Sequence, residues 1–317
     1  ASEAIELDDV IVAWGELLPD LPVSTRTAVQ NAQPLRVDDY VVGAVRAELL
    51  PKTLQGEAVD RILDVQAVVS RTYAVTNLGR HRAEGFDLCD GTHCQLYRRP
   101  LRTEHDHDPA ARAVADTHGQ VITFGGRPIQ AVFHSSCGGY TAAAEDVWNG
   151  AAVSYLRLVP DWFCSRGNEA HWEFMADEQQ IRRALNADAR TAMGDRLDRI
   201  DIVRRDAAGR AALIAVAGAR TPVVRAEEFR SVMRQAFGPR SIQSTWFTVT
   251  RRGNQIQFTG VGYGHGVGLC QAGAALRAQA GQTPATILAH YFPGTHVESV
   301  SALVSVISRR ILTPPAQ

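Results

Sequence analysis

Two stretches near the start of the chain carry apolar residues at helical spacing. The first runs from Asp38, which we expect to be the N-cap, to Pro51, which cannot continue a helix. The second runs from Gly56 to Leu78 and ends before Gly79, a residue type that commonly follows a helix C-terminus. The pattern predicts two helices that meet near Pro51 and present Glu48 at their junction.

Beyond residue 118 the pattern changes to one typical of β-strands. Three hairpins are predicted, over residues 119–134, 200–217 and 246–258, each turned at a glycine. The first of them leaves His134 at the end of a strand. Helical spacing returns over residues 177–193 and 226–237. This order predicts an α+β fold, with helices in the N-terminal part packed against antiparallel sheets and hairpins.

The chain shows no low-complexity linker between residues 35 and 310. We therefore expect one main domain over residues 35–310, which can contain an inserted α+β subdomain at about residues 170–245. Residues 1–34 form a lead-in segment in this scheme, and residues 311–317 form a tail.

Composition excludes some classes of function. The 317 residues are 45% hydrophobic with a formal net charge of −1, which argues against a nucleic-acid partner because such proteins usually present a net basic surface. No apolar run approaches the roughly 18 residues needed to cross a bilayer. The first residues lack the basic and apolar regions of a signal peptide, so the sequence fits either a cytosolic protein or the mature form of an exported one.

The densest chemistry lies between Phe86 and Tyr97. Cys89, His93 and Cys94 fall within six residues, and two thiolates with an imidazole are a ligand set that zinc prefers. A Cys89–Cys94 disulfide, or simple burial of the two thiols, is the alternative.

Two further islands, residues 133–141 and 262–274, are rich in glycine and reactive side chains. Together with the first island they suggest one composite site in a single cleft. Cys137 and Cys164 are either buried free thiols or a disulfide that closes a loop of about 27 residues, for roughly 3 kcal/mol of stabilisation. Cys270 reads as a small buried filler.

These motifs, taken in order, resemble the SpoIID/LytB family of bacterial cell-wall proteins, named for stage II sporulation protein D and the amidase enhancer. The resemblance covers residues 35–310 and rests on ordered elements along the chain: Glu48 with Pro51, Val65–Ala74, Cys89–Tyr97, His134–Thr141, Trp148 with Tyr155-Leu156, and Gly264–Ala274. The family commonly has Glu-Met-Pro where this chain has Glu-Leu-Leu-Pro, one residue longer.

The resemblance implies a peptidoglycan lytic transglycosylase that cleaves the bond between N-acetylmuramic acid and N-acetylglucosamine, with Glu48 as the single general acid and base. Such an acid needs a pKa raised from about 4.3 toward 6 by a partly apolar pocket. One carboxyl suffices because the sugar's own 6-hydroxyl replaces water as the nucleophile. The alternative is a non-catalytic activator of a cell-wall amidase that binds glycan in the same cleft.

The resemblance also implies site residues. It adds His81 to Cys89, His93 and Cys94 as ligands of a structural zinc, a closed set that leaves no position for substrate. The candidates for substrate binding are Arg71, Tyr73, Gln95, Tyr97, His134, Ser135, Ser136, Gly138, Gly139, Tyr263, His265 and Gln271.

Two other readings of these residues are less favoured. Ser135 or Ser136 could act as a nucleophile with His265 as base, but the chain has no Gly-x-Ser-x-Gly elbow. Tight glycine turns that bind sugar hydroxyl and acetamido groups are the simpler explanation. A zinc hydrolase is disfavoured because the chain lacks a His-Glu-x-x-His motif. We expect an exported protein of the cell envelope or exterior, with peptidoglycan strands and an amidase as its partners.

Overall fold

The structure is a computed structural model that describes residues 10–13, 33–49, 54–99, 108–165 and 171–299. It confirms the mixed α+β fold. The chain divides into two compact units, one of residues 1–132, 278–289 and 294–317, the other of residues 133–277 and 290–293. The predicted division into lead-in, main domain and tail stays a prediction, and residues 311–317 lie outside the described residues.

The first unit is built on the two helices expected from the apolar spacing. They are α2 (Val37–Glu48) and α3 (Glu57–Thr76), and α3 also packs against α4 (Pro109–Asp116). Ile62, Val65 and Val69 of α3 are at most 1% exposed, so burial of this apolar stripe stabilises the helix. The chain leaves α3 through Gly79, whose φ of +75° is accessible to glycine at little cost.

The predicted N-cap is wrong. Arg36, in an extended conformation, precedes α2, and Asp38 lies in the first helical turn. The Asp38 carboxylate instead accepts a 2.9 Å hydrogen bond from Arg71 and contacts His118. The Asp38 side chain therefore forms an ion pair with a buried arginine instead of capping the helix. Pro51, predicted to end this helix, lies outside the described residues.

Arg71 connects several elements of the first unit from inside its core. The side chain is 2% exposed, and its guanidinium donates to Val114 O at 3.0 Å and Gln120 O at 3.3 Å besides Asp38. These bonds tie α3 to α2, α4 and the strand that follows α4. The folded state tolerates this buried charge only while Arg71 keeps these partners, because they compensate for its lost hydration.

The strands of the first unit form two small sheets. The first predicted hairpin is confirmed only up to Pro128: β4 (Gln120–Phe124) and β5 (Arg127–Pro128) pair antiparallel around two glycines, and β14 (His296–Ser299) pairs with the other edge of β4. The second sheet has the order β2 (Gln33–Leu35), β1 (Val10–Ala13) and β3 (Leu88–Cys89). A short 3-10 helix, η1 (Arg82–Glu84), precedes β3.

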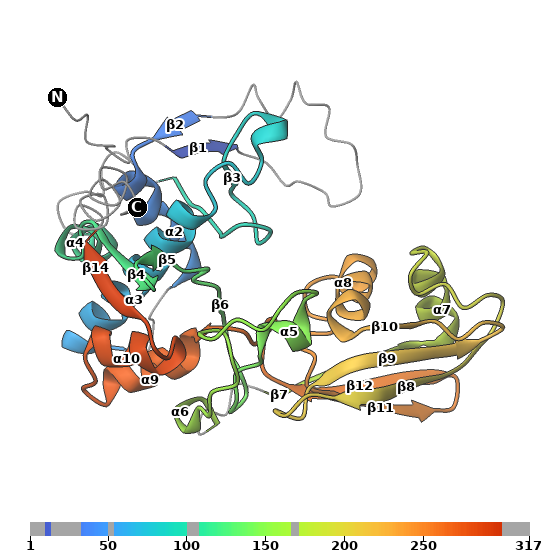
Figure 1. Cartoon of the computed structure of the whole chain (residues 1–317). Helices are drawn as coiled ribbons and strands as arrows, with labels where there is room; N and C mark the ends of the chain where they lie inside the picture. The colour runs from blue at the N-terminus through green and yellow to red at the C-terminus, as the bar shows by residue number, and fades with distance from the viewer. Residues whose placement is uncertain (1–9, 14–32, 50–53, 100–107, 166–170, 300–317) are drawn as a thin grey trace, which may run out of the picture. The chain divides into compact units, whose positions relative to one another are not determined.

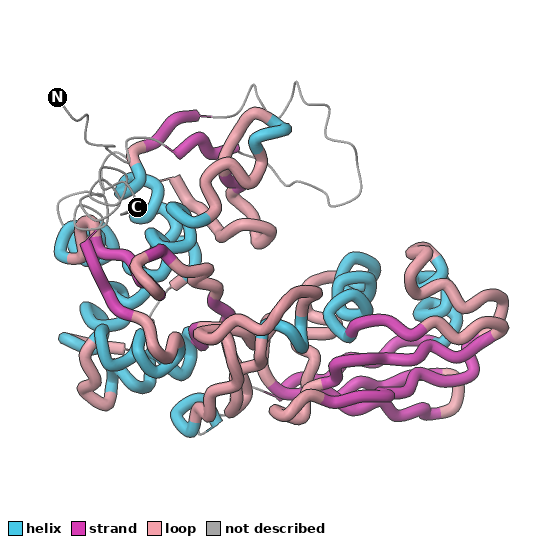
Figure 2. Tube along the Cα trace, in the orientation of Figure 1, coloured by secondary structure: helices cyan, strands magenta, loops and turns pink. Residues whose placement is uncertain are grey.

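Long antiparallel strands dominate the second unit (Figure 2). One sheet has the order β10 (Val223–Arg225), β9 (Ala211–Gly218) and β8 (Leu197–Arg205), and the other has the order β11 (Phe247–Arg252), β12 (Gln255–Val261) and β7 (His171–Asp177). Both predicted hairpins of this region are confirmed. Two helices, α7 (Glu178–Asn186) and α8 (Ala226–Phe237), pack on one side of these strands over a core that contains Phe229, Phe247 and Phe258 (Figure 1).

The helix predicted over residues 177–193 is shorter than expected. It ends at Asn186, whose side-chain carbonyl accepts hydrogen bonds from the main-chain N–H groups of Met193 and Gly194. These bonds fold the chain back before the predicted end. The preceding strand, β7, was not predicted, whereas α8 has the predicted limits.

Short elements complete the second unit. The strand β6 (Phe133–His134) pairs in parallel with β13 (Leu269–Cys270), which sets His134 opposite Cys270 and confirms that His134 ends a strand. Two single-turn helices follow β6 in sequence, α5 (Ala144–Val147) and α6 (Trp162–Ser165). The chain passes between the units within α9 (Gln271–Gln279) and again within α10 (Pro284–Tyr291).

Candidate functional site

Glu48 is the last residue of α2 and is partly buried. Its Oε1 accepts a 2.6 Å hydrogen bond from the main-chain N–H of Leu96. Burial raises the pKa of Glu48 from 4.5 to about 7, although this hydrogen bond to the charged form opposes the rise. A carboxyl group with such a pKa is partly protonated near neutral pH and can both donate and accept a proton.

Aromatic side chains lie in the same unit. Tyr97 stacks on Tyr40 with ring centroids 5.3 Å apart and an interplanar angle of 4°. Tyr73 is 5% exposed, and its phenol pKa is raised by burial first and further by the charges of nearby groups that include Glu48. Gln95, which is 1% exposed, donates to Ser70 O at 3.3 Å. Gln95 and Tyr97 flank Leu96, the residue that donates to Glu48.

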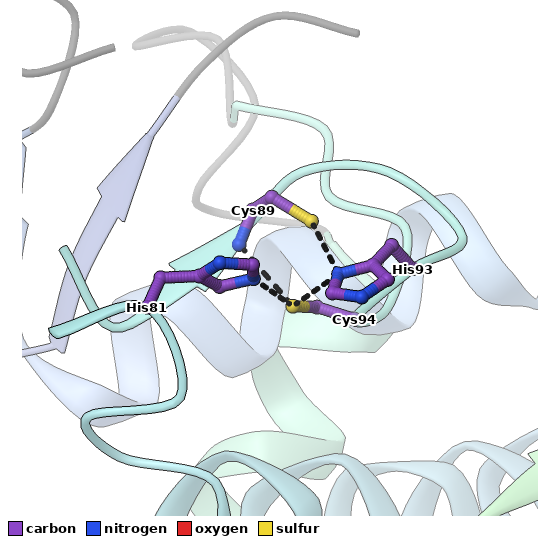
Figure 3. Close-up of side chains that lie close together, drawn as sticks. All are labelled: His81, Cys89, His93 and Cys94. Carbon is purple, nitrogen blue, oxygen red and sulfur yellow. Dashed lines mark hydrogen bonds between the residues drawn. The ribbon is translucent and has the colours of Figure 1, made fainter. Parts of the chain in front are cut away.

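The four predicted metal ligands converge (Figure 3). One ligand atom from each of His81, Cys89, His93 and Cys94 lies within 4.8 Å of all the others. Cys94 Sγ is 3.3 Å from His81 Nε2 and 3.8 Å from His93 Nδ1, and Cys89 Sγ is 3.9 Å from His93 Nδ1. Tetrahedral zinc with such ligands has neighbouring donor atoms roughly 3.3–3.8 Å apart, so the group fits a metal ion.

The local backbone explains how adjacent His93 and Cys94 face the same point. A turn occupies residues 91–94, closed by a 3.1 Å hydrogen bond from Cys94 N–H to Gly91 O. Neighbouring side chains of an extended strand would point apart, but this turn brings them together. A hydrogen bond between the two thiol groups is the main cause that lowers the pKa of Cys89, and the same bond raises the pKa of Cys94.

The predicted site residues of the second unit form a separate cluster. His134 is 4% exposed, and its Nδ1 bonds to Val267 O at 3.1 Å. His265 packs against His134 at 5.5 Å and against Trp148 at 5.0 Å between ring centroids, and its Nδ1 accepts from Val267 N–H. Burial lowers the pKa of His134 well below its ordinary value and that of His265 to about 3, so both imidazoles are neutral at pH 7.

The serines and glycines that were predicted to bind substrate lie beside this histidine cluster. Ser135 is exposed, and Ser136 Oγ lies 3.3 Å from Cys164 Sγ. Within the described residues neither serine hydroxyl bonds to a histidine, so the arrangement does not favour the nucleophile hypothesis. Gly138 and Gly139 have φ values of +77° and +129°, as expected of the predicted turns. They follow the strand bridge between Ser136 and Tyr263, and Gln271 is 8% exposed at the start of α9.

The sequence analysis did not identify two groups that contribute to the site around Glu48. The Leu96 contact is made by the main chain, so no side-chain pattern reveals it. Gly43 of α2 lies against Tyr97, where a Cβ atom would be 2.4 Å from a ring carbon. In the sequence, Gly43 stands out only as a glycine within a helical pattern. Glu48 with the ligand group belongs to one unit and the histidine cluster to the other, so the single composite cleft stays a prediction.

Comparisons with known proteins place the chain in a class of bacterial sporulation and cell-wall proteins. A family model described as Stage II sporulation protein (SpoIID) matches residues 25–124, and a domain of unknown function (DUF8618) matches residues 164–268. The chain is 29% identical over 307 residues to Stage II sporulation protein D of Bacillus subtilis, covering 92% of this chain and 83% of that protein. It is 26% identical over 280 residues to the Amidase enhancer of the same organism, covering 75% of this chain and 38% of that protein.

A further relative is an uncharacterised protein of Brachyspira hyodysenteriae, 28% identical over 280 residues, with 83% of this chain and 67% of that protein covered. These matches support the resemblance of the chain to the SpoIID/LytB family. Among the described helices, none is both long enough and apolar enough to cross a membrane.

Proposed function

We propose that the protein is a lytic transglycosylase that cleaves peptidoglycan glycan strands, with Glu48 as its only general acid and base. The observation that carries the proposal is the Glu48 carboxyl, whose pKa of about 7 is set by burial at the end of α2. The similarity to sporulation protein D supports a cell-wall substrate.

The proposed reaction needs one proton to travel in each direction. Protonated Glu48 gives its proton to the glycosidic oxygen as the bond to C1 of N-acetylmuramic acid breaks. The 6-hydroxyl of the same sugar then bonds to C1, and the Glu48 carboxylate takes its proton. The products are a 1,6-anhydro end and a free 4-hydroxyl, and Glu48 returns to its starting state. A carboxyl with a pKa near 7 serves both steps, because neither protonation state is strongly favoured.

Zinc is the metal that the ligand group of the first unit fits best. Two thiolates and two imidazoles would close a tetrahedral site, so the ion would crosslink the segment from His81 to Cys94 without reaching substrate. This segment continues directly into Leu96, and through Leu96 a bound zinc would help to position the Glu48 carboxylate.

Within the second unit we assign sugar contacts to the more accessible predicted residues, Ser135, Ser136, Tyr263 and His265 with the turn at Gly138. Arg71, Tyr73, Gln95 and Tyr97 are buried in the first unit and His134, Gly139 and Gln271 in the second, and we propose that each set supports the site residues of its own unit. An exported, envelope location follows from this substrate.

The test is mass spectrometry of purified glycan strands, with and without stem peptides, after incubation with the protein. Wild type is expected to release anhydromuramyl products, and Glu48→Gln, which keeps the shape of the side chain, should release none. Glu173→Gln, an exposed change on β7, is the matched control and should act as wild type. Release of products by Glu48→Gln would remove Glu48 from the mechanism.

A second function is favoured by the similarity to the Amidase enhancer. In that case the protein would bind glycan or a cell-wall amidase and catalyse nothing itself. Glu48→Gln separates the two functions, because a binding protein should still stimulate the amidase when this carboxyl is removed.

A further inference from the structure

A second group of potential ligands lies in the other unit, apart from the site already described. It consists of Cys137, Asp161, Cys164 and Cys270, which come from three separate places in the sequence. The side chains are 0%, 0%, 3% and 0% exposed, and one donor atom from each lies within 4.8 Å of all the others. Burying a carboxyl group is costly unless it keeps polar or charged partners.

We infer that Cys137, Cys164, Cys270 and Asp161 form a second metal site, which takes a soft divalent cation such as zinc with three thiolates and one carboxylate. This inference does not depend on the proposed function. The site would be closed and structural, because the four protein ligands complete a tetrahedron.

The separations of the donor atoms suit such an ion. Cys137 Sγ is 3.4 Å from Asp161 Oδ2. In a tetrahedron with Zn–S of about 2.3 Å and Zn–O of about 2.0–2.2 Å, a sulfur and an oxygen lie about 3.5 Å apart. The site therefore needs little rearrangement to accept the ion.

Main-chain N–H groups point at the sulfurs, as expected for thiolates. Cys270 Sγ accepts from the N–H of Cys137 at 3.2 Å and of Gly273 at 3.3 Å. Cys137 Sγ accepts from Gly139 N–H at 3.4 Å. Such bonds stabilise the negative charge of a thiolate more than they stabilise a neutral thiol.

Two side chains hold the Asp161 carboxylate in place. Tyr291 donates a 2.7 Å hydrogen bond to Asp161 Oδ2, and Arg277 pairs with Oδ1 at 3.4 Å. Outer partners of this kind orient the ligating carboxylates of metal sites. A Cβ atom at Gly273 would lie 2.0 Å from Asp161 Oδ2, so only glycine leaves room for the carboxylate here.

The positive charge near the four ligands also matches the negative charge that the proposed metal site would carry. One divalent ion with three thiolates and one carboxylate carries a net charge of minus two. Arg277 supplies one compensating positive charge and Arg210 a second. Arg210 is fully buried and donates to Cys137 O, whereas its Nε and Nη1 atoms have no hydrogen-bond partner and no carboxylate pairs with its side chain among the described residues. The carboxylates of Asp206 and Glu227 already act on this guanidinium, and thiolates of Cys137 and Cys270 would add negative charge closer to the ligand group.

The rival arrangement is a Cys137–Cys164 disulfide, which the sequence left open. It would engage two of the three sulfurs and leave Cys270 as a thiol, and it would remove the thiolate charge that faces Arg210. The metal site accounts for all three cysteines and for both arginines.

The test begins with zinc counted per chain in protein purified without chelators or added thiols. Together with the site at Cys89 and Cys94, wild type should hold two zinc ions. The Cys270→Ala variant and its matched control Cys94→Ser should each retain one after dialysis against a weak chelator. Thiol titration of denatured wild type with a chelator present should find all five cysteines reactive. Only three reactive thiols, or unchanged zinc content in Cys270→Ala, would overturn the inference.

The Cys270→Ala variant can fail to fold, and X-ray absorption spectroscopy of wild type then decides the question alone. Zinc bound at both sites should show an average of more sulfur than nitrogen or oxygen neighbours, whereas zinc at the first site alone should show equal numbers. The equal ratio with one zinc per chain would contradict the second site.

Discussion

The main-chain N–H of Leu96 donates a 2.6 Å hydrogen bond to Oε1 of Glu48. Leu96 follows Cys94 by two residues, so the segment that presents the metal ligands also holds the proposed catalytic carboxyl. The bond favours the ionised carboxylate, while burial favours the protonated acid and has the larger effect. The balance between the two sets the pKa on which the first prediction depends.

The activity of the enzyme should fall as pH rises above 7. The first step needs protonated Glu48, and the protonated fraction decreases about tenfold per pH unit well above its pKa of about 7. We expect kcat/KM for release of anhydromuramyl ends to follow this decline between pH 7 and pH 9. Glu173→Gln should give the same profile, and a flat profile across this range would contradict Glu48 as the acid.

The sequence named the candidate residues of this site but not its energetics. Cys89, His93 and Cys94 were named from their spacing, and Glu48 and His81 from the family resemblance; the structure brings the four candidate ligands together. The Leu96 contact did not, since every residue carries the same N–H group and only the fold decides where it points. Asp38 shows the same limit: its residue type suits an N-cap, yet a buried arginine 33 residues away decides its partner. Cys270 is buried as predicted, but only the fold shows that Cys137 and Cys164, which are distant in sequence, are its neighbours.

Replacing Glu48 should stabilise the protein at alkaline pH. The folded-state pKa lies above the unfolded value, so the folded state binds more protons between about pH 4.5 and 7 and its stability falls as pH rises through that window. Glu48→Gln removes this loss of stability. For a pKa shift of this size, the loss amounts to up to roughly 3 kcal/mol. Urea unfolding at pH 5 and pH 8 measures it. The advantage of Glu48→Gln over wild type should grow between these pH values, whereas a constant difference would show that Glu48 ionises as freely when folded as when unfolded.

Gly43→Ala should destabilise the protein although alanine favours helices by about 1 kcal/mol. The new Cβ would lie 2.4 Å from a ring carbon of Tyr97 and 2.8 Å from Arg98 O, and Arg98 N–H also bonds to Gly43 O at 3.0 Å. The segment that follows Leu96 would have to move, at a cost of about 1–3 kcal/mol for overpacking. Gly91→Ala is the control within the same segment, because no neighbouring atom lies within 4 Å of its Cβ position. Equal unfolding midpoints for the two variants would refute the close contact.

Exchanging the metal of the first site should separate a structural ion from a catalytic one. Cadmium also prefers thiolate ligands and should fill the group of two cysteines and two histidines. A structural ion only crosslinks its segment, so the cadmium-loaded protein should keep the pH dependence that Glu48 sets, and its thermal midpoint should exceed that of the metal-free protein. Cys94→Ser should lose the ion of this site and the stability that this ion adds, while it keeps the ion of the second site. If cadmium instead moves the pH profile, the ion acts on the reacting groups and the site is not the closed scaffold that its four ligands indicate.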